Sequence, residues 1–115
     1  MGDILKIEML RDEINKLSRE VLISEVWMQL RKDFTLAGMA DFPVIEPCSA
    51  EQLVLVLTGF IKEAKCKTTN WDNINYRIDI PSRIDVNSLE ADQYAQLIAY
   101  RTLLKVWTRK QFKQG

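Results

Sequence analysis

The amino-acid sequence predicts an all-α protein, a helical bundle of three long helices with one or two short helices. Apolar residues recur at three- and four-residue spacing along most of the chain, which is the period of an amphipathic helix. Only residues 74–80 alternate as a strand would, and a lone strand has nothing to pair with. A chain of 115 residues can bury one core but not two, so we expect a single helical domain over residues 1–115.

A long N-terminal helix is expected over residues 3–36, a stretch without proline and glycine. Its first half carries a heptad seam of five aliphatic residues: Ile7, Leu10, Ile14, Leu17 and Val21. A second apolar stripe, offset around the helix, takes over in residues 22–34, so the helix bends or changes its packing partner near residue 22. Gly38 is expected to end the helix, because glycine readily takes the left-handed conformation found at helix ends.

The length of this helix suggests self-association. A straight helix over residues 3–36 would be roughly 50 Å long, whereas a globule of this size has a radius of gyration of about 13 Å. A heptad seam is also typical of helices that pair with another chain. We therefore expect a homodimer, or a complex with another protein, through Ile7, Leu10, Ile14, Leu17 and Val21. The alternative is that the seam packs in the core of a monomeric bundle.

The middle of the chain contains the second long helix. The connection over residues 39–48 has three large apolar side chains that should pack over a helix junction, namely Phe42, Val44 and Ile45. Ser49 and Gln52 form a capping box that opens the helix. This helix is apolar nearly all round, so we expect it to be buried between others. We interpret Gly59 within it as a sign of a close helix crossing.

Residues 68–87 admit two interpretations. Apolar and polar residues alternate from residue 74 to residue 80, the pattern of a half-buried strand. A short helix capped by Thr69 and closed by Pro81 explains the same residues, and we favour it because no second strand is available. The pattern from Ser82 to Asp85 predicts one further helical turn.

The last long helix is expected to begin at Asn87 or Ser88 and to run to about Phe112. No acidic residue follows Asp92, and four basic residues of the helix gather among aromatic ones: Arg101, Lys105, Arg109 and Lys110. The first three are spaced by four residues, so they share one helix face. Such a face could bind an acidic protein or a nucleic acid. The alternative is that the helix dipole favours cations at this end.

Composition argues against an enzyme. The chain contains no histidine, which excludes histidine-based catalysis and histidine-ligated metals. No glycine-rich phosphate loop is present. Cys48 and Cys66 lie at either end of the second helix, roughly 25 Å apart, too far for a disulfide, and two cysteines do not complete a zinc site. We expect no catalytic residue, no metal and no cofactor.

The charge balance also narrows the function. Lysine and arginine total 16 and so do aspartate and glutamate, so the chain lacks the positive excess typical of nucleic-acid binding. No apolar run reaches the roughly 20 residues of a membrane span, and we expect a cytoplasmic protein. The sequence predicts a non-enzymatic interaction or scaffold module that self-associates through its N-terminal helix. The alternative is an accessory nucleic-acid-binding protein that uses the last helix.

Overall fold

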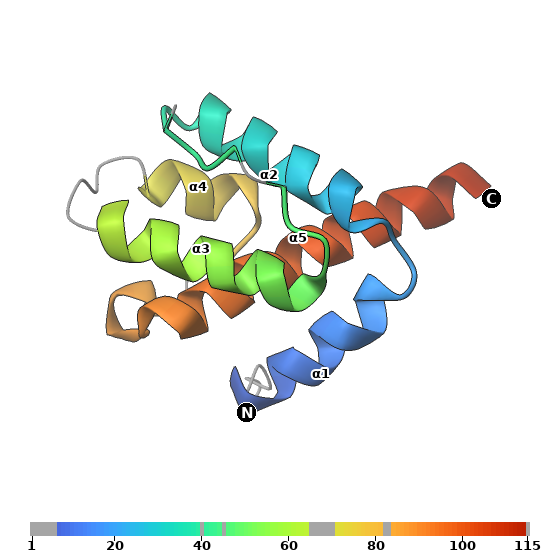
Figure 1. Cartoon of the computed structure of the whole chain (residues 1–115), viewed down its shortest axis with the longest axis horizontal. Coiled ribbons are helices and arrows are strands. Elements are labelled where there is room, and N and C mark those ends of the chain that lie inside the picture. The colour runs from blue at the N-terminus through green and yellow to red at the C-terminus, as the bar shows by residue number, and fades with distance from the viewer. Residues whose placement is uncertain (1–6, 40, 45, 65–70, 82–83, 115) are drawn as a thin grey trace.

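The computed structural model describes residues 7–39, 41–44, 46–64, 71–81 and 84–114. Within these ranges every regular element is a helix: α1 (Ile7–Ser18), α2 (Ile23–Leu36), α3 (Ala50–Ala64), α4 (Trp71–Arg77), the 3-10 turn η2 (Val86–Ser88) and α5 (Ala91–Gln114). The all-α fold class is therefore confirmed. α5 runs through the whole molecule, and α1, α2 and α3 all pack against it (Figure 1).

The prediction of one long N-terminal helix is wrong. The helix ends at Ser18 and a second one starts at Ile23, close to residue 22 where the apolar stripe changes. Leu22 has an extended backbone, with φ −86° and ψ 132°. A straight helix of roughly 50 Å would exceed the longest dimension of the molecule, 41 Å. The break lets α1 and α2 pack against α5 separately, each along its own stripe.

The helix ends follow the sequence signals closely. At the end of α2, Gly38 has a φ of 93° and the amide of Met39 donates to the carbonyl of Phe34 (2.9 Å), as in a Schellman motif. At the start of α3, the Ser49 hydroxyl accepts a hydrogen bond from the Gln52 amide (3.1 Å). The Gln52 side chain reaches back to the amide of Cys48 rather than Ser49 (3.0 Å).

The start predicted for the last helix is wrong by about one turn. Ser88 closes η2 by donating to the carbonyl of Asp85 (2.8 Å), and α5 begins at Ala91. The amide before it, that of Glu90, donates to the Gln93 side chain (2.9 Å). A glutamine three residues downstream therefore caps α5, whereas the glutamine that caps α3 lies four residues after the amide it binds.

The helical interpretation is confirmed for Trp71–Arg77, but the helix ends four residues before Pro81, which was expected to close it. α4 ends at Arg77, and Asp79 then reverses the chain with a φ of 59°. The amide of Ile80 donates back to the Asn75 carbonyl (3.0 Å). The sequence alternates here because the exposed Tyr76 lies between two buried residues of the same helical region, Ile74 and Ile78. Three residues named in the predictions lie outside the described residues: the expected caps Thr69 and Ser82, and Cys66.

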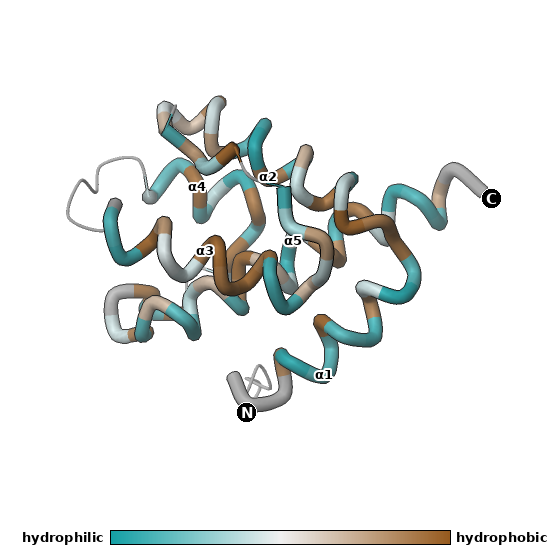
Figure 2. The backbone as a smooth tube through the Cα atoms, in the orientation of Figure 1, coloured by the Kyte–Doolittle hydropathy of each residue, from teal (hydrophilic) through white to brown (hydrophobic). Residues whose placement is uncertain are grey.

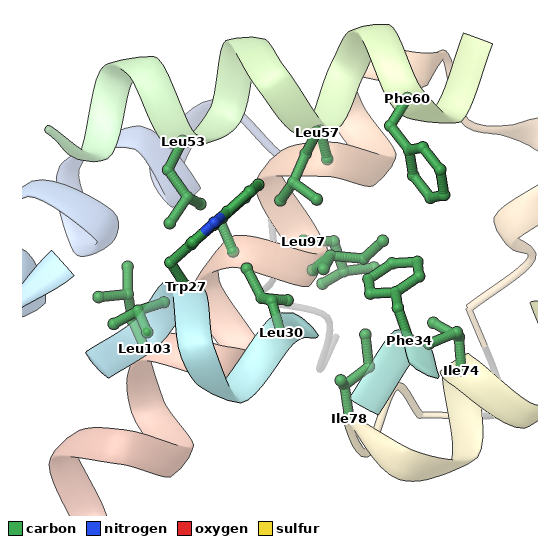
Figure 3. Packing of buried hydrophobic residues seen from close by; sticks show 14 of the residues in the cluster. Trp27, Leu30, Phe34, Leu53, Leu57, Phe60, Ile74, Ile78, Leu97 and Leu103 are labelled. Carbon is green, nitrogen blue, oxygen red and sulfur yellow. The ribbon is translucent and has the colours of Figure 1, made fainter. Parts of the chain in front are cut away.

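The core is continuous through all five α-helices, and its centre is aromatic. Phe42, from the connection before α3, lies 4.7 Å from both Trp27 and Phe34 between ring centroids. Phe34 of α2 in turn points toward Phe60 of α3, with Ile74 of α4 beside it (Figure 3). The predicted packing of Phe42 over a helix junction is confirmed. Val44 is exposed instead, and Ile45 lies outside the described residues.

The hydropathy of the helices matches their positions. α1 is mostly hydrophilic with a thin apolar stripe, while the middle of α3 is strongly hydrophobic (Figure 2). The close crossing inferred from Gly59 is wrong, because a side-chain carbon built at this position meets nothing within 4 Å.

The two glycines should respond oppositely to alanine. Gly38→Ala is expected to lower the free energy of unfolding by about 1–2 kcal/mol, because its left-handed backbone crowds a side chain. Gly59→Ala is expected to raise it by about 0.5–1 kcal/mol, since alanine is the better helix former and has room here. Urea unfolding followed by circular dichroism measures both. A destabilising Gly59→Ala would mean that α3 meets a neighbour at this point after all.

Candidate interaction surface

The four basic residues singled out in the sequence all lie on α5, namely Arg101, Lys105, Arg109 and Lys110. Two of them hold α5 to the N-terminal half of the chain. Arg109 donates a hydrogen bond to the side-chain oxygen of Gln29 in α2 (2.5 Å). The Lys110 amine donates to the backbone carbonyl of Glu20, in the turn before α2 (3.1 Å). These contacts fix the direction in which the cationic face points.

Lys105 belongs to a buried ionic network centred on Asp33, whose exposed fraction is 0%. Arg77 Nε of α4 lies 3.3 Å from one carboxylate oxygen of Asp33, and Lys105 Nζ of α5 lies 3.5 Å from the other. The Gln29 amide donates to that second oxygen (3.1 Å). A buried carboxylate is tolerated only with such partners. The network therefore joins α2, α4 and α5.

Asp33 was not among the functional residues predicted from the sequence. It lies three residues after Leu30 and one before Phe34, which places it inside the apolar stripe of α2. A charged residue at a core-facing helical position is a signal that could have identified it, because aspartate is rarely buried without a partner. The partner could not have been found this way, since Arg77 is 44 residues away in the chain.

Two clefts flank Arg109 along the C-terminal half of α5. The first has a volume of about 380 Å³ and is lined by α2 and α5, through Glu25, Met28, Gln29, Lys32, Val106, Arg109 and Lys110. The second has a volume of about 410 Å³ and is lined by Asp79, Arg101, Leu104, Lys105, Thr108, Arg109 and Phe112. We refer to the residues of these two clefts together as the α5 surface.

The α5 surface combines exposed apolar side chains with positive charge. Met28 is 68% exposed and Phe112 is 80% exposed, whereas Val106 is buried below them. Against the acidic Glu25 and Asp79, the two clefts present five cations: Lys32, Arg101, Lys105, Arg109 and Lys110. Buried Asp33 offsets one of them, Lys105. Although the chain has no net charge, the α5 surface is therefore locally cationic and partly apolar.

The N-terminal heptad seam lies elsewhere and faces inward. Leu10, Ile14 and Val21 are buried in the core of the same chain, and Leu17 packs against it. The side chain of Ile7 lies outside the described residues. α5 is the main partner of α1, so the chain itself covers most of the seam. The described seam side chains therefore pack inside one molecule, and their pairing with a second copy stays a prediction.

The described residues do not indicate a metal site or a membrane span. No cluster of three or more histidine, cysteine or acidic residues could hold a metal ion within those ranges. Cys48 is an exposed free thiol near Gln52. None of the described helices combines the length and the apolarity that a membrane crossing needs. The absence of catalysis stays a prediction from composition.

Tyr94 makes a second polar contact between α5 and α4. It is buried against Trp71, with 5.5 Å between ring centroids, and its hydroxyl donates a short hydrogen bond to the Asn75 side-chain oxygen. Burial raises the pKa of Tyr94 far above its ordinary value of 10.0, and the negative charge of Asp72 raises this pKa further. The folded protein therefore keeps this phenol neutral at alkaline pH.

This tyrosine should make the fold sensitive to alkali. Above pH 10 the unfolded chain releases the Tyr94 proton while the folded chain retains it, so the free energy of unfolding falls as pH rises, by up to about 1.4 kcal/mol per pH unit. Below pH 10 the contribution is fully present. In Tyr94→Phe this pH-dependent decrease in the free energy of unfolding should vanish. Urea unfolding of both proteins between pH 8 and pH 11.5 measures the difference; parallel pH profiles would contradict the assignment.

Comparison with known proteins gives no functional lead. No protein-family model matches the chain. No curated protein and no solved structure matches it significantly. The residues of the α5 surface therefore provide the basis for a functional proposal.

Proposed function

We propose that this protein is a non-enzymatic, helical protein-interaction module of the cytoplasm, and that the α5 surface binds an acidic and apolar segment of its partner. The observation that supports the proposal most is the combination of Met28 and Phe112, both largely exposed, with Arg109 between them. Aromatic residues, methionine and arginine are the types enriched at protein interfaces. The exposed free thiol of Cys48 suits a reducing compartment.

The hydrogen bonds that hold the cations of the α5 surface in place favour binding of a partner. Arg109 is held by Gln29, which itself donates to buried Asp33. A cation whose direction is already fixed loses less conformational freedom when a carboxylate binds it. The apolar side chains would supply most of the affinity, while the cations would select acidic partners and speed encounter.

Nucleic acid is the second candidate ligand. The observation in its favour is that Phe112 is exposed beside Arg109, and base stacking on an aromatic ring combined with phosphate contacts is common in single-strand binders. Against it, the chain carries equal numbers of positive and negative side chains, whereas phosphate-dominated affinity usually needs a positive excess. We therefore favour a protein segment.

Selection from a displayed library of random peptides tests the proposal. Peptides enriched by the wild-type protein are expected to carry acidic residues beside an aromatic or aliphatic one. Their affinity should fall more than tenfold in Arg109→Glu and in Phe112→Asp, and it should not change in Leu55→Asp, which alters an exposed residue outside the α5 surface. Circular dichroism confirms that each variant is folded.

Two results would overturn the proposal. One is peptide enrichment no greater than that of an unrelated protein of similar size. The other is salt-dependent binding of single-stranded DNA or RNA oligonucleotides, lost in Arg109→Glu, without selection of acidic peptides; that result would assign the surface to nucleic acid instead.

A further inference from the structure

A third groove lies away from the α5 surface, between α1 and α3. Its volume is about 400 Å³, and the N-terminal end of α5 completes its wall. Figure 1 shows the course of α1 and α3, the two helices that supply most of its lining. Ile14 and Val54 give it an apolar lining, and Leu55 at its edge is 65% exposed. We refer to it as the α1–α3 groove.

The charge of this groove is opposite to that of the α5 surface. Glu51 and Asp92 line it, with Arg11 as the one cation among its described lining residues. Both carboxylates are exposed and neither forms an ion pair with a described cation. Both lie in the first turn of a helix, where the helix dipole favours acidic residues. The dipole does not explain the exposed leucine beside them.

The C-terminal end of α5 has the complementary character. It extends past the other helices (Figure 1), and it presents the exposed ring of Phe112 next to Arg109 and Lys110. Asp92 in the groove and Phe112 at the tip belong to the same helix, about 30 Å apart at 1.5 Å per residue. The tip therefore cannot enter the groove of its own chain.

We propose that the tip of α5 inserts Phe112 into the α1–α3 groove of a second copy of this chain, with Arg109 and Lys110 facing Glu51 and Asp92 of that copy. The proposal rests on the proposed function, because it identifies the acidic and apolar partner of the α5 surface as another molecule of the same protein. Self-association then uses the exposed tip and groove, not the heptad seam of α1, which is largely buried.

The contact has two physical consequences. Tip and groove are different surfaces, so the contact is heterologous, and each added molecule leaves one tip and one groove free. Association therefore produces open chains of increasing length rather than a closed dimer. An interface of one aromatic side chain and a few charges falls below the roughly 1,200 Å² of stable complexes, so the association is weak and is reduced by salt.

Sedimentation velocity and light scattering from about 10 μM to about 1 mM protein, a range suited to a weak contact, test this contact. The average mass of the wild-type protein should rise with concentration without levelling off at the dimer. Phe112→Asp, which blocks the tip, and Leu55→Asp, which blocks the groove, should each remain monomeric. An equimolar mixture of the two variants should form dimers and stop there, because only one tip and one groove remain functional per pair.

A wild-type protein that stays monomeric over the whole range, or a mixture that stays monomeric, would overturn this proposal. Such a protein could still bind the selected acidic peptides through the α5 surface, in which case the proposed function stands and only self-association fails. Leu55→Asp separates the two directly: it should lose self-association and keep peptide binding, whereas Phe112→Asp should lose both. Both positions are exposed, so neither substitution disturbs the core.

Discussion

Replacing both cations around Asp33, in the variant Arg77→Met/Lys105→Met, is expected to lower the free energy of unfolding by about 3–5 kcal/mol. The reason is an asymmetry in burial. Arg77 and Lys105 are each about one-third exposed in their side chains (35% and 34%), whereas the Asp33 carboxylate is fully buried. The cations can reach water if their partner is lost. The carboxylate cannot, and among the described residues it would keep only the side-chain hydrogen bond from Gln29.

A third substitution isolates the ionic contribution. Adding Asp33→Leu to the double variant removes the unpaired charge, and it should recover most of the lost stability, because apolar replacements of buried ion clusters are often neutral or stabilising. Arg77→Met alone should cost less than the double variant, since Lys105 still faces the carboxylate. Urea unfolding followed by tryptophan fluorescence measures all of these. A triple variant as unstable as the double one would contradict the assignment of the loss to Asp33.

The ionic network matters for α4 in particular. This helix has seven residues, and helices so short do not persist alone in water. Besides its apolar contacts, α4 is tied by Arg77 to α2 and by Asn75 to Tyr94 of α5. Lys105 also donates to the Arg77 carbonyl at the end of α4 (3.4 Å). We therefore expect α4 to lose its hydrogen-exchange protection first when Asp33 is left unpaired.

Local features of the fold were predictable because their causes are local. The capping of α3 by Ser49 and the stop at Gly38 follow from side-chain chemistry and backbone freedom within a few residues. The change of stripe near residue 22 indicated that the packing of the first helix must change. The stripe did not reveal that the chain breaks there, because a bend and a break give the same periodicity.

The identity of the packing partners was not predictable. A heptad seam such as the one from Leu10 to Val21 indicates that one helix face is buried, but it does not identify the helix that covers this face. In this protein α5 covers the seam. The apolar residues of α5 occupy so much of its surface that α1, α2 and α3 all pack against it. The spacing of Arg101, Lys105 and Arg109 placed them correctly on one helix. The contacts of Lys105 with Asp33 and of Arg109 with Gln29 depend on tertiary structure and had no sequence signal.

The second large effect is expected at the centre of the aromatic core. Phe34→Ala should lower the free energy of unfolding by about 3–5 kcal/mol, the range for a fully buried phenylalanine. Phe34 has no exposed surface, and its ring contacts Phe42 at 4.7 Å, Phe60 at 5.5 Å and Trp71 at 5.9 Å between centroids. Removing it leaves a cavity bordered by α3, α4 and the connection before α3, and three aromatic rings lose a neighbour.

Two matched variants make this result interpretable. Phe34→Leu keeps most of the volume and should cost less than half as much, about 1–1.5 kcal/mol. Met28→Ala on the same helix changes an exposed side chain and should stay within about 0.5 kcal/mol of the wild type. Thermal and urea unfolding measure the series. Domains of this size have only about 5–15 kcal/mol of stability, so Phe34→Ala should remove a large share of it. A loss below about 1 kcal/mol would show that the aromatic cluster does not hold the helices together.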